Sequence, residues 1–230
     1  MKNAQTIWLA CGENCMPINV LRRHSKVAPS TPYSAGRSDV EQFEYFEKNQ
    51  YSNFLSKSYI VEANAYSSNC YLNIACKSSG PCYPGRHRFL EFTHHNPLEA
   101  EDKLTLKRRI NRMIMARTSN QQHCLFYHHR SRQGFQRSKD FIKQKMINIL
   151  NYHQSSTISI CYSQSLVKNE NERGVDIVNC ADGRIFFCTL KTLRPWSGDN
   201  LDEFFGKVDD DLFRKVFDVQ EKMASLKKGV

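Results

Sequence analysis

The sequence predicts an α/β fold with a mostly parallel sheet, helices on both faces and therefore three layers. Short segments rich in β-branched and aromatic residues, such as 124–127 and 157–162, are typical of buried strands. Apolar residues recur at helical spacing in 101–117 and 137–152. Because strands alternate with helices of about a dozen residues, we expect parallel strands joined by helical crossovers.

The chain opens with a strand, a tight turn and a helix. Residues 6–10 (TIWLA) have the composition of a short buried strand, and Gly12 supplies the turn. Pro17 suits the first turn of a helix because its missing N–H is not needed there. Residues 28–40 are rich in turn formers and are expected to be a loop.

An amphipathic helix and an irregular insertion are expected next. Aromatic residues at positions 43, 46 and 54, with acidic residues among them, indicate a helix in 39–55. Residues 61–86 combine three cysteines with Asn, Ser, Gly and Pro, and we interpret them as an irregular insertion. At 230 residues the chain is expected to be a single domain, 1–230.

Further strands are predicted at 88–93 and 184–190, and the last helix at 212–226. Three acidic residues, Asp209 to Asp211, precede that helix, where carboxylates complement the helix dipole. Capping accounts for these acids without a metal ion.

The composition favours an anionic partner. A formal charge of +10 and a pI near 9.2 attract a phosphorylated or otherwise anionic small molecule or polymer, and nucleic acid is possible. No apolar run is long enough for membrane insertion. The apolar run in 7–10 is too short for a secretory signal, so a cytoplasmic location is expected.

Cys11 and Cys15 differ in their expected environments. Cys11 belongs to the end of the first strand, whereas Cys15 lies at the start of a helix, where the helix dipole favours the thiolate. The turn residues Glu13 and Asn14 precede Cys15, and the backbone N–H groups of 14–16 are candidates to receive an oxyanion. A buried structural thiol is the alternative interpretation.

Histidines follow two of the expected strands. His94 and His95 come after 88–93, while His128, His129 and Arg130 come after 124–127. Ligands of open parallel sheets bind beyond the carboxyl ends of the strands, so these loops are expected to converge with Cys15. A histidine beside a cysteine can act as its base.

No cofactor is predicted. The sequence contains no Gly-x-Gly-x-x-Gly motif, no phosphate-binding loop and no Gly-x-Ser-x-Gly motif. The side chains of Cys70, Cys76, Cys82 and His87 are possible zinc ligands, but their spacing lacks the paired short hooks of structural zinc sites. No metal is therefore predicted.

The helix at 101–117 carries a basic face. Lys103 and Lys107 are four residues apart, as are Arg108 and Arg112, away from the apolar stripe. A solvated face is the simple interpretation. An anion-binding face is the alternative, since the whole chain is basic.

Several segments together resemble a family of uncharacterised, mainly bacterial proteins described as papain-like cysteine peptidases. Some members accompany surface-polysaccharide biosynthesis genes. The similarity runs over most of the chain and is carried by GENC with LRRH, PYSAGRSD, EFTHHN, KRRINR, CLFYHHR, WSGDN and KVDDDLF.

The resemblance implies that Cys15 is the nucleophile and that His94 or His95 is the base. The implied third group is Asp199 in WSGDN, or Asp176. Arg37 and Trp196 lie in matching segments and join His128, His129 and Arg130 as expected substrate contacts.

These observations predict a cysteine-dependent hydrolase or acyltransferase acting on an anionic, glycan or peptide substrate, with a role in bacterial surface-polysaccharide biosynthesis. The alternative is a non-catalytic protein that binds a phosphorylated polymer or nucleic acid through its basic surface.

Overall fold

The computed structural model describes residues 5–65, 68–79, 88–198 and 204–226. Its larger sheet has five strands in the order β1 (Ile7–Gly12), β6 (His123–His129), β7 (Ile158–Leu166), β9 (Ile185–Thr192) and β8 (Gly174–Cys180). The first four are parallel, and β8 pairs antiparallel with β9 at one edge. The predicted α/β fold with a mostly parallel sheet is confirmed.

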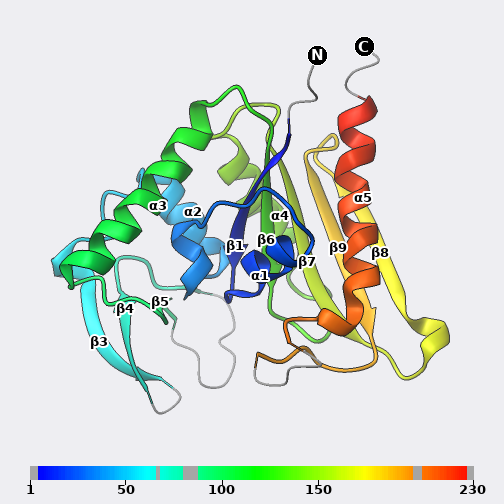
Figure 1. Cartoon of the computed structure of the whole chain (residues 1–230), viewed down its shortest axis with the longest axis horizontal. Coiled ribbons are helices and arrows are strands. Elements are labelled where there is room, and N and C mark those ends of the chain that lie inside the picture. The colour runs from blue at the N-terminus through cyan, green and yellow to red at the C-terminus, as the bar shows by residue number, and fades with distance from the viewer. Residues whose placement is uncertain (1–4, 66–67, 80–87, 199–203, 227–230) are drawn as a thin grey trace.

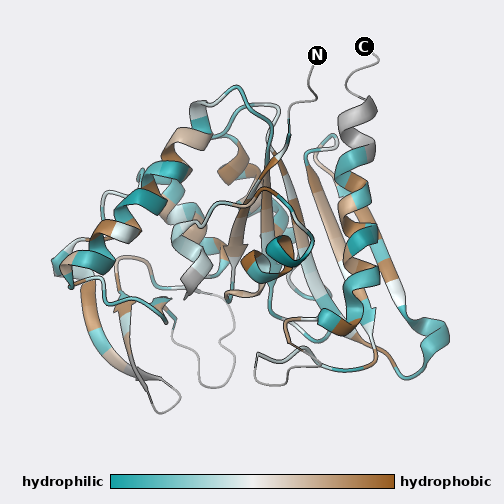
Figure 2. Cartoon of the chain, viewed as in Figure 1, coloured by the Kyte–Doolittle hydropathy of each residue, from teal (hydrophilic) through white to brown (hydrophobic). Residues whose placement is uncertain are grey.

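Helices cover both faces of this sheet (Figure 1). α1 (Met16–Arg23) and α5 (Asp210–Leu226) lie on one face, and α2 (Val40–Lys48), α3 (Ala100–Thr118) and α4 (Lys139–Leu150) contribute to the core on the other. Successive strand residues point to opposite faces, so Trp8 and Ala10 pack with α1 and α5 while Leu9 and Cys11 enter the other core. Figure 2 shows the resulting hydrophobic centre.

A second, smaller sheet corrects two expectations. β3 (Ile60–Ala65) and β4 (Ser68–Asn73) form an antiparallel hairpin, so this part of 61–86 is regular. The strand predicted at 88–93 is β5 (Leu90–Phe92), and it pairs with β4 and with β2 (Gly36–Arg37) rather than joining the parallel sheet. Packing against the partner strands stabilises these short strands, and the composition of each segment alone does not reveal it.

α2 is shorter than the helix predicted at 39–55. α2 is capped by Asp39, whose side chain accepts from the backbone N–H groups of Glu41 and Gln42. The helix ends at Lys48 because Gln50 and Tyr51 adopt left-handed conformations, with φ values of 48° and 61°. Phe54 lies beyond the helix and is nevertheless fully buried in the core.

The predicted apolar stripe of α3 is present, with Leu106, Ile110 and Met113 buried. Asp210 and Asp211 fall inside the first turn of α5 rather than before it. Within the described residues no helix is both long and apolar enough to span a bilayer.

Candidate active site

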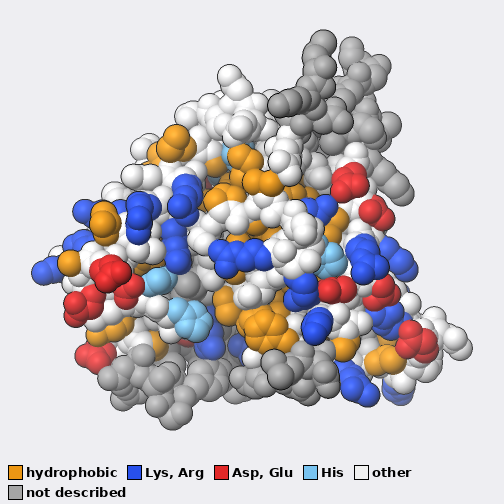
Figure 3. Space-filling view, in the orientation of Figure 1, with side chains coloured by type: hydrophobic (Ala, Val, Ile, Leu, Met, Phe, Trp, Pro, Cys, Tyr) orange, Lys and Arg blue, Asp and Glu red, His pale blue; other side chains and the backbone are white. Residues whose placement is uncertain are grey.

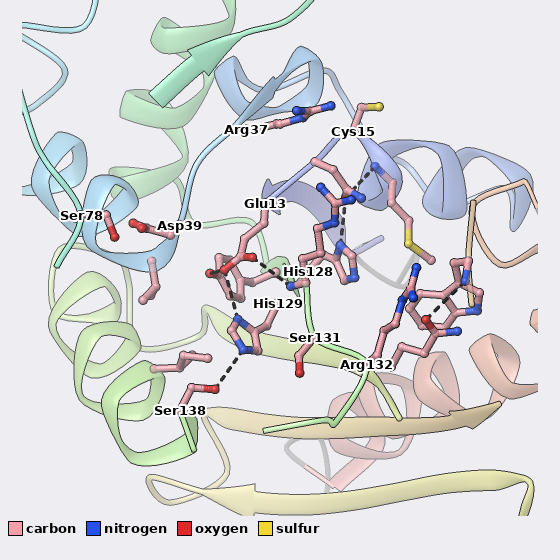
Figure 4. A pocket seen from close by; sticks show the side chains of 18 of the residues that line it. Glu13, Cys15, Arg37, Asp39, Ser78, His128, His129, Ser131, Arg132 and Ser138 are labelled. Atoms are coloured by element: carbon pink, nitrogen blue, oxygen red, sulfur yellow. Dashed lines mark hydrogen bonds and ion pairs between the residues drawn. The ribbon is translucent and has the colours of Figure 1, made fainter. Parts of the chain in front are cut away.

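A cleft of about 1360 Å³ lies at the carboxyl ends of β1 and β6 (Figure 4). The turn between β1 and α1, the end of β6 and the start of α4 supply much of its lining. The predicted site residues among its lining are Glu13, Asn14, Cys15, Arg37, His94, His128, His129, Arg130 and Trp196. The structure therefore brings most of the predicted site into one cavity.

Gly12 allows the first turn to approach β6 closely. Its φ is +131°, and a Cβ built on it would lie 2.5 Å from the His128 carbonyl oxygen. The next amide, Glu13 N–H, donates to that same oxygen at 3.1 Å. A side chain at position 12 would push the turn away from β6, so glycine positions the residues that follow.

Cys15 is the N-cap residue of α1 and is partly exposed in the cleft. Burial raises the pKa of its thiol, and the opposing effects of a backbone hydrogen bond and the Arg37 guanidinium are smaller. The lowered pKa expected at a helix start is therefore not found, because partial burial outweighs the helix. The resting group is a protonated thiol.

Asn14 organises the turn around Cys15. Its side-chain oxygen accepts from the Met16 backbone N–H at 3.1 Å and contacts His128 Nδ1 at 2.9 Å. The Met16 amide, one of the expected oxyanion donors, is thus already engaged. Figure 4 shows Cys15 beside Arg37 at one end of the cleft, on the opposite side of Glu13 from His129 and Ser138.

The two histidines after β5 have different positions. His94 lines the cleft, and His95 is not part of its described lining. His95 Nδ1 is instead 2.7 Å from Asp102 Oδ1 in the first turn of α3. Burial opposes ionisation of Asp102, but hydrogen bonds from His95 and the Asn96 backbone N–H outweigh it and lower the pKa of the carboxyl.

His128 is held as a neutral ring. It stacks on Tyr162 with centroids 4.8 Å apart, and burial lowers its pKa to about 3. Because the Asn14 side-chain oxygen only accepts, His128 Nδ1 carries the proton of that hydrogen bond. His128 thus ties β6 to the Cys15 turn.

Each ring nitrogen of His129 contacts one side chain. Its Nδ1 is 3.1 Å from Glu13 Oε1, and its Nε2 is 2.9 Å from Ser138 Oγ. Glu13 Oε2 also accepts from the Arg130 backbone N–H at 3.1 Å. Sequence reasoning missed Ser138, whose only signal is its place at the start of the helix predicted at 137–152, where a serine ordinarily caps.

Arg37 and Trp196 both line the cleft and are also anchored elsewhere. Arg37 Nη1 lies 3.3 Å from the fully buried Glu91 carboxylate. Trp196 Nε1 donates to Asp209 Oδ2 at 2.9 Å. Asp209 therefore holds a cleft side chain, a role that helix capping alone did not suggest.

Asp199 and Asp176 were the two candidates for the third catalytic group. Asp199 lies outside the described residues. Asp176 is on the edge strand β8, where its carboxylate pairs with Lys191 at 2.8 Å. Asp102 was missed, although an acid in the first turn of the predicted helix at 101–117 was visible in the sequence.

Of the four possible zinc ligands, Cys82 and His87 lie outside the described residues. Cys70 is buried on β4, and Cys76 is partly exposed. Within the described ranges no group of three or more His, Cys, Asp or Glu side chains is arranged to hold a metal ion.

Comparison with protein-family models, with curated proteins and with solved structures found no match.

Proposed function

We propose that the protein is a covalent acyl hydrolase or acyltransferase in which Cys15 is the nucleophile. The observation that carries this proposal is that Cys15 and His94 line one cleft at the carboxyl end of the parallel sheet. Ligands of such sheets bind at that edge. The thiol is accessible from the cleft, and its position at the start of α1 favours negative charge as a thiolate forms.

His94 is the proposed base. Because burial keeps Cys15 protonated, the thiol needs a proton acceptor when it attacks a carbonyl carbon. His94 lies in the cleft, whereas His95 is engaged by Asp102. His95 with Asp102 is the alternative base pair, and Asp199 remains a proposed orienting group.

The proposed substrate carries an anionic group. Arg130, Arg132 and Arg137 line the cleft and make no ion pair with a carboxylate in the described part of the chain. Such guanidinium groups bind carboxylates and phosphates in a bidentate manner. A glycan or peptide bearing such a group, in bacterial surface-polysaccharide biosynthesis, agrees with the resemblance, and free thiols at the described cysteines agree with a cytoplasmic setting.

Alkylation with iodoacetamide tests the nucleophile. Peptide mapping of the folded protein at pH 8 should show the adduct on Cys15 before the buried thiols react, and Cys15→Ala should remove it. The His94→Ala variant should slow the reaction by about 100-fold, the scale of a general base. His95→Ala is the matched control. An unmodified Cys15, or equal rates in both histidine variants, would contradict the assignment.

A second candidate function is supported by a cluster of positively charged side chains between α1 and α3 (Figure 3). Arg22 Nη2 and Arg112 Nη1 both donate to Ser30, at 2.9 and 3.0 Å. Beside them, Arg109 Nη1 is buried without a hydrogen-bond partner in the described structure. Burial lowers the pKa of Arg109, and the charges of Arg112 and Arg22 add to this effect.

This cluster favours binding of a phosphorylated polymer or nucleic acid. Retention on single-stranded nucleic acid should fall steeply as salt increases. A double variant, Arg22→Ala with Arg112→Ala, should reduce the dependence on salt, whereas Arg214→Ala with Lys215→Ala removes the same charge from α5 and should not. Equal retention of both double variants would exclude a specific role for the cluster.

A further inference from the structure

A serine, a histidine and a glutamate form a continuous hydrogen-bonded row in the same cleft. Ser138 Oγ is 2.9 Å from His129 Nε2, and His129 Nδ1 is 3.1 Å from Glu13 Oε1. The three residues come from the start of α4, the end of β6 and the turn after β1 (Figure 4). All three line the cleft.

The protons of this row are fixed by its acid. When Glu13 is ionised and His129 is neutral, His129 Nδ1–H donates to Glu13, because a carboxylate only accepts hydrogen bonds. The lone pair of His129 Nε2 then faces Ser138 and accepts from its hydroxyl. This tautomer is the one that a histidine needs to remove a proton from a serine nucleophile.

The surroundings hold the histidine and the acid in place. Glu13 is 3% exposed and also accepts from the Arg130 backbone N–H. The His129 ring stacks on Phe135, with centroids 5.6 Å apart and planes 19° apart. Both groups are thus positioned by packing as well as by hydrogen bonds, as a catalytic row requires.

Ser138 is not used as a helix cap. It is the N-cap residue of α4, yet its side chain accepts no hydrogen bond from the helix backbone. Its hydroxyl is directed to His129 instead. The first turn of a twelve-residue helix also provides amide N–H groups and a positive dipole end, which stabilise negative charge beside Ser138.

We propose that Ser138, His129 and Glu13 are a serine hydrolase triad for carboxylic esters, distinct from Cys15. Ser138 Oγ attacks the ester carbonyl carbon while its proton moves to His129 Nε2. Collapse of the tetrahedral intermediate breaks the ester C–O bond, and His129 returns the proton to the departing alcohol. Water, deprotonated by His129, then attacks the acyl-serine and releases the acid and the serine hydroxyl.

In this scheme Ser138 and His129 are the catalytic residues, and Glu13 is a positioning residue. Arg132 and Arg137 line the cleft together with Ser138. Their charges select an ester with a carboxylate or phosphate on its acyl or alcohol part. An anionic acyl ester is therefore the substrate class.

A fluorophosphonate probe tests the triad because it phosphonylates an activated serine with loss of fluoride. Incubation of the folded full chain, followed by peptide mapping, should place the adduct on Ser138. Ser138→Ala should remove it, and His129→Gln should slow it by about 1000-fold. Ser131→Ala is the matched control, because Ser131 lines the same cleft and its Oγ accepts from the Gln133 backbone N–H instead of contacting a histidine.

The role of Glu13 needs a readout beyond folding. Glu13→Gln should slow labelling by at least about 100-fold, with Glu13→Asp restoring part of the rate, because only a carboxylate fixes the tautomer. Circular dichroism and a urea unfolding curve establish that each variant is folded. Absence of a Ser138 adduct on folded wild-type protein, or unchanged labelling in His129→Gln, would overturn the proposal.

The reaction at Ser138 does not require Cys15. Cys15→Ala should keep the phosphonyl adduct on Ser138, and Ser138→Ala should keep alkylation of Cys15. Loss of one reaction with survival of the other therefore identifies which nucleophile has failed.

Discussion

Replacing His128 should remove a large part of the acid sensitivity of the folded state. Burial lowers the pKa of His128 from 6.5 to about 3, so the unfolded chain binds a proton between these values and the folded chain does not. The contribution of His128 to the free energy of unfolding is therefore fully present above pH 6.5 and is lost as the pH falls towards 3. His128 is only 4% exposed, beneath Tyr162 and beside Asn14, so solvent screens this effect little.

The magnitude follows from the two pKa values. Each pH unit between them is worth about 1.4 kcal/mol for one group. At pH 4.5, two units below 6.5, His128 should therefore reduce the free energy of unfolding by about 3 kcal/mol relative to pH 7.5.

Urea unfolding followed by tryptophan fluorescence, at pH 7.5 and pH 4.5, measures this difference. His128→Gln loses the stacking and hydrogen bond at both pH values, and only the wild type has the additional acid-dependent loss from residue 128. The free energy of unfolding of the wild type should thus fall by about 3 kcal/mol more than that of the variant between the two pH values. An equal fall in both proteins would refute the argument that His128 is buried and neutral.

Three further substitutions test the packing around the site by urea unfolding at neutral pH. Gly12→Ala should destabilise the fold and slow both labelling reactions, because its Cβ would lie 2.5 Å from the His128 carbonyl oxygen; an unchanged protein would contradict the close approach. Phe43→Ala should cost about 3–5 kcal/mol, since the ring is fully buried, and a cost below about 1 kcal/mol would disagree with that burial. Glu47→Ala should cost about 3–5 kcal/mol because the Tyr51 hydroxyl loses its buried acceptor and Arg117 loses a buried counter-charge, whereas a neutral effect would count against this network.

Regular periodicity made much of the parallel sheet and its helices predictable. The stripe of Leu106, Ile110 and Met113 identified α3, and dense apolar segments identified β6 and β7. β8 was missed because it is an edge strand with mostly exposed side chains, so it has no buried alternation. The hairpin of β3 and β4 was missed because the composition of 61–86, rich in Asn, Ser, Gly and Pro, indicated an irregular segment.

Chemistry was predictable where it follows strand ends. Cys15 follows β1, and His128 and His129 are the last two residues of β6, so placing them at this edge of the sheet required only the rule for parallel sheets. The contact between His129 and Ser138 was not predictable. The loop between them has no regular spacing of apolar residues, so its path could not be inferred from the sequence. The raised pKa of Cys15 was also missed, since burial depends on the packed structure.

The tetrapeptide from Gly12 to Cys15 has a consequence for engineering. Glu13 contacts His129, Asn14 contacts His128, and Cys15 lines the cleft beside them, so one short turn serves two reactive groups. Substitutions of Glu13 and Ser138 should be strongly non-additive in double-mutant cycles, because both residues contact His129. Redesign of either reactive group therefore has to treat the turn and the end of β6 as one unit.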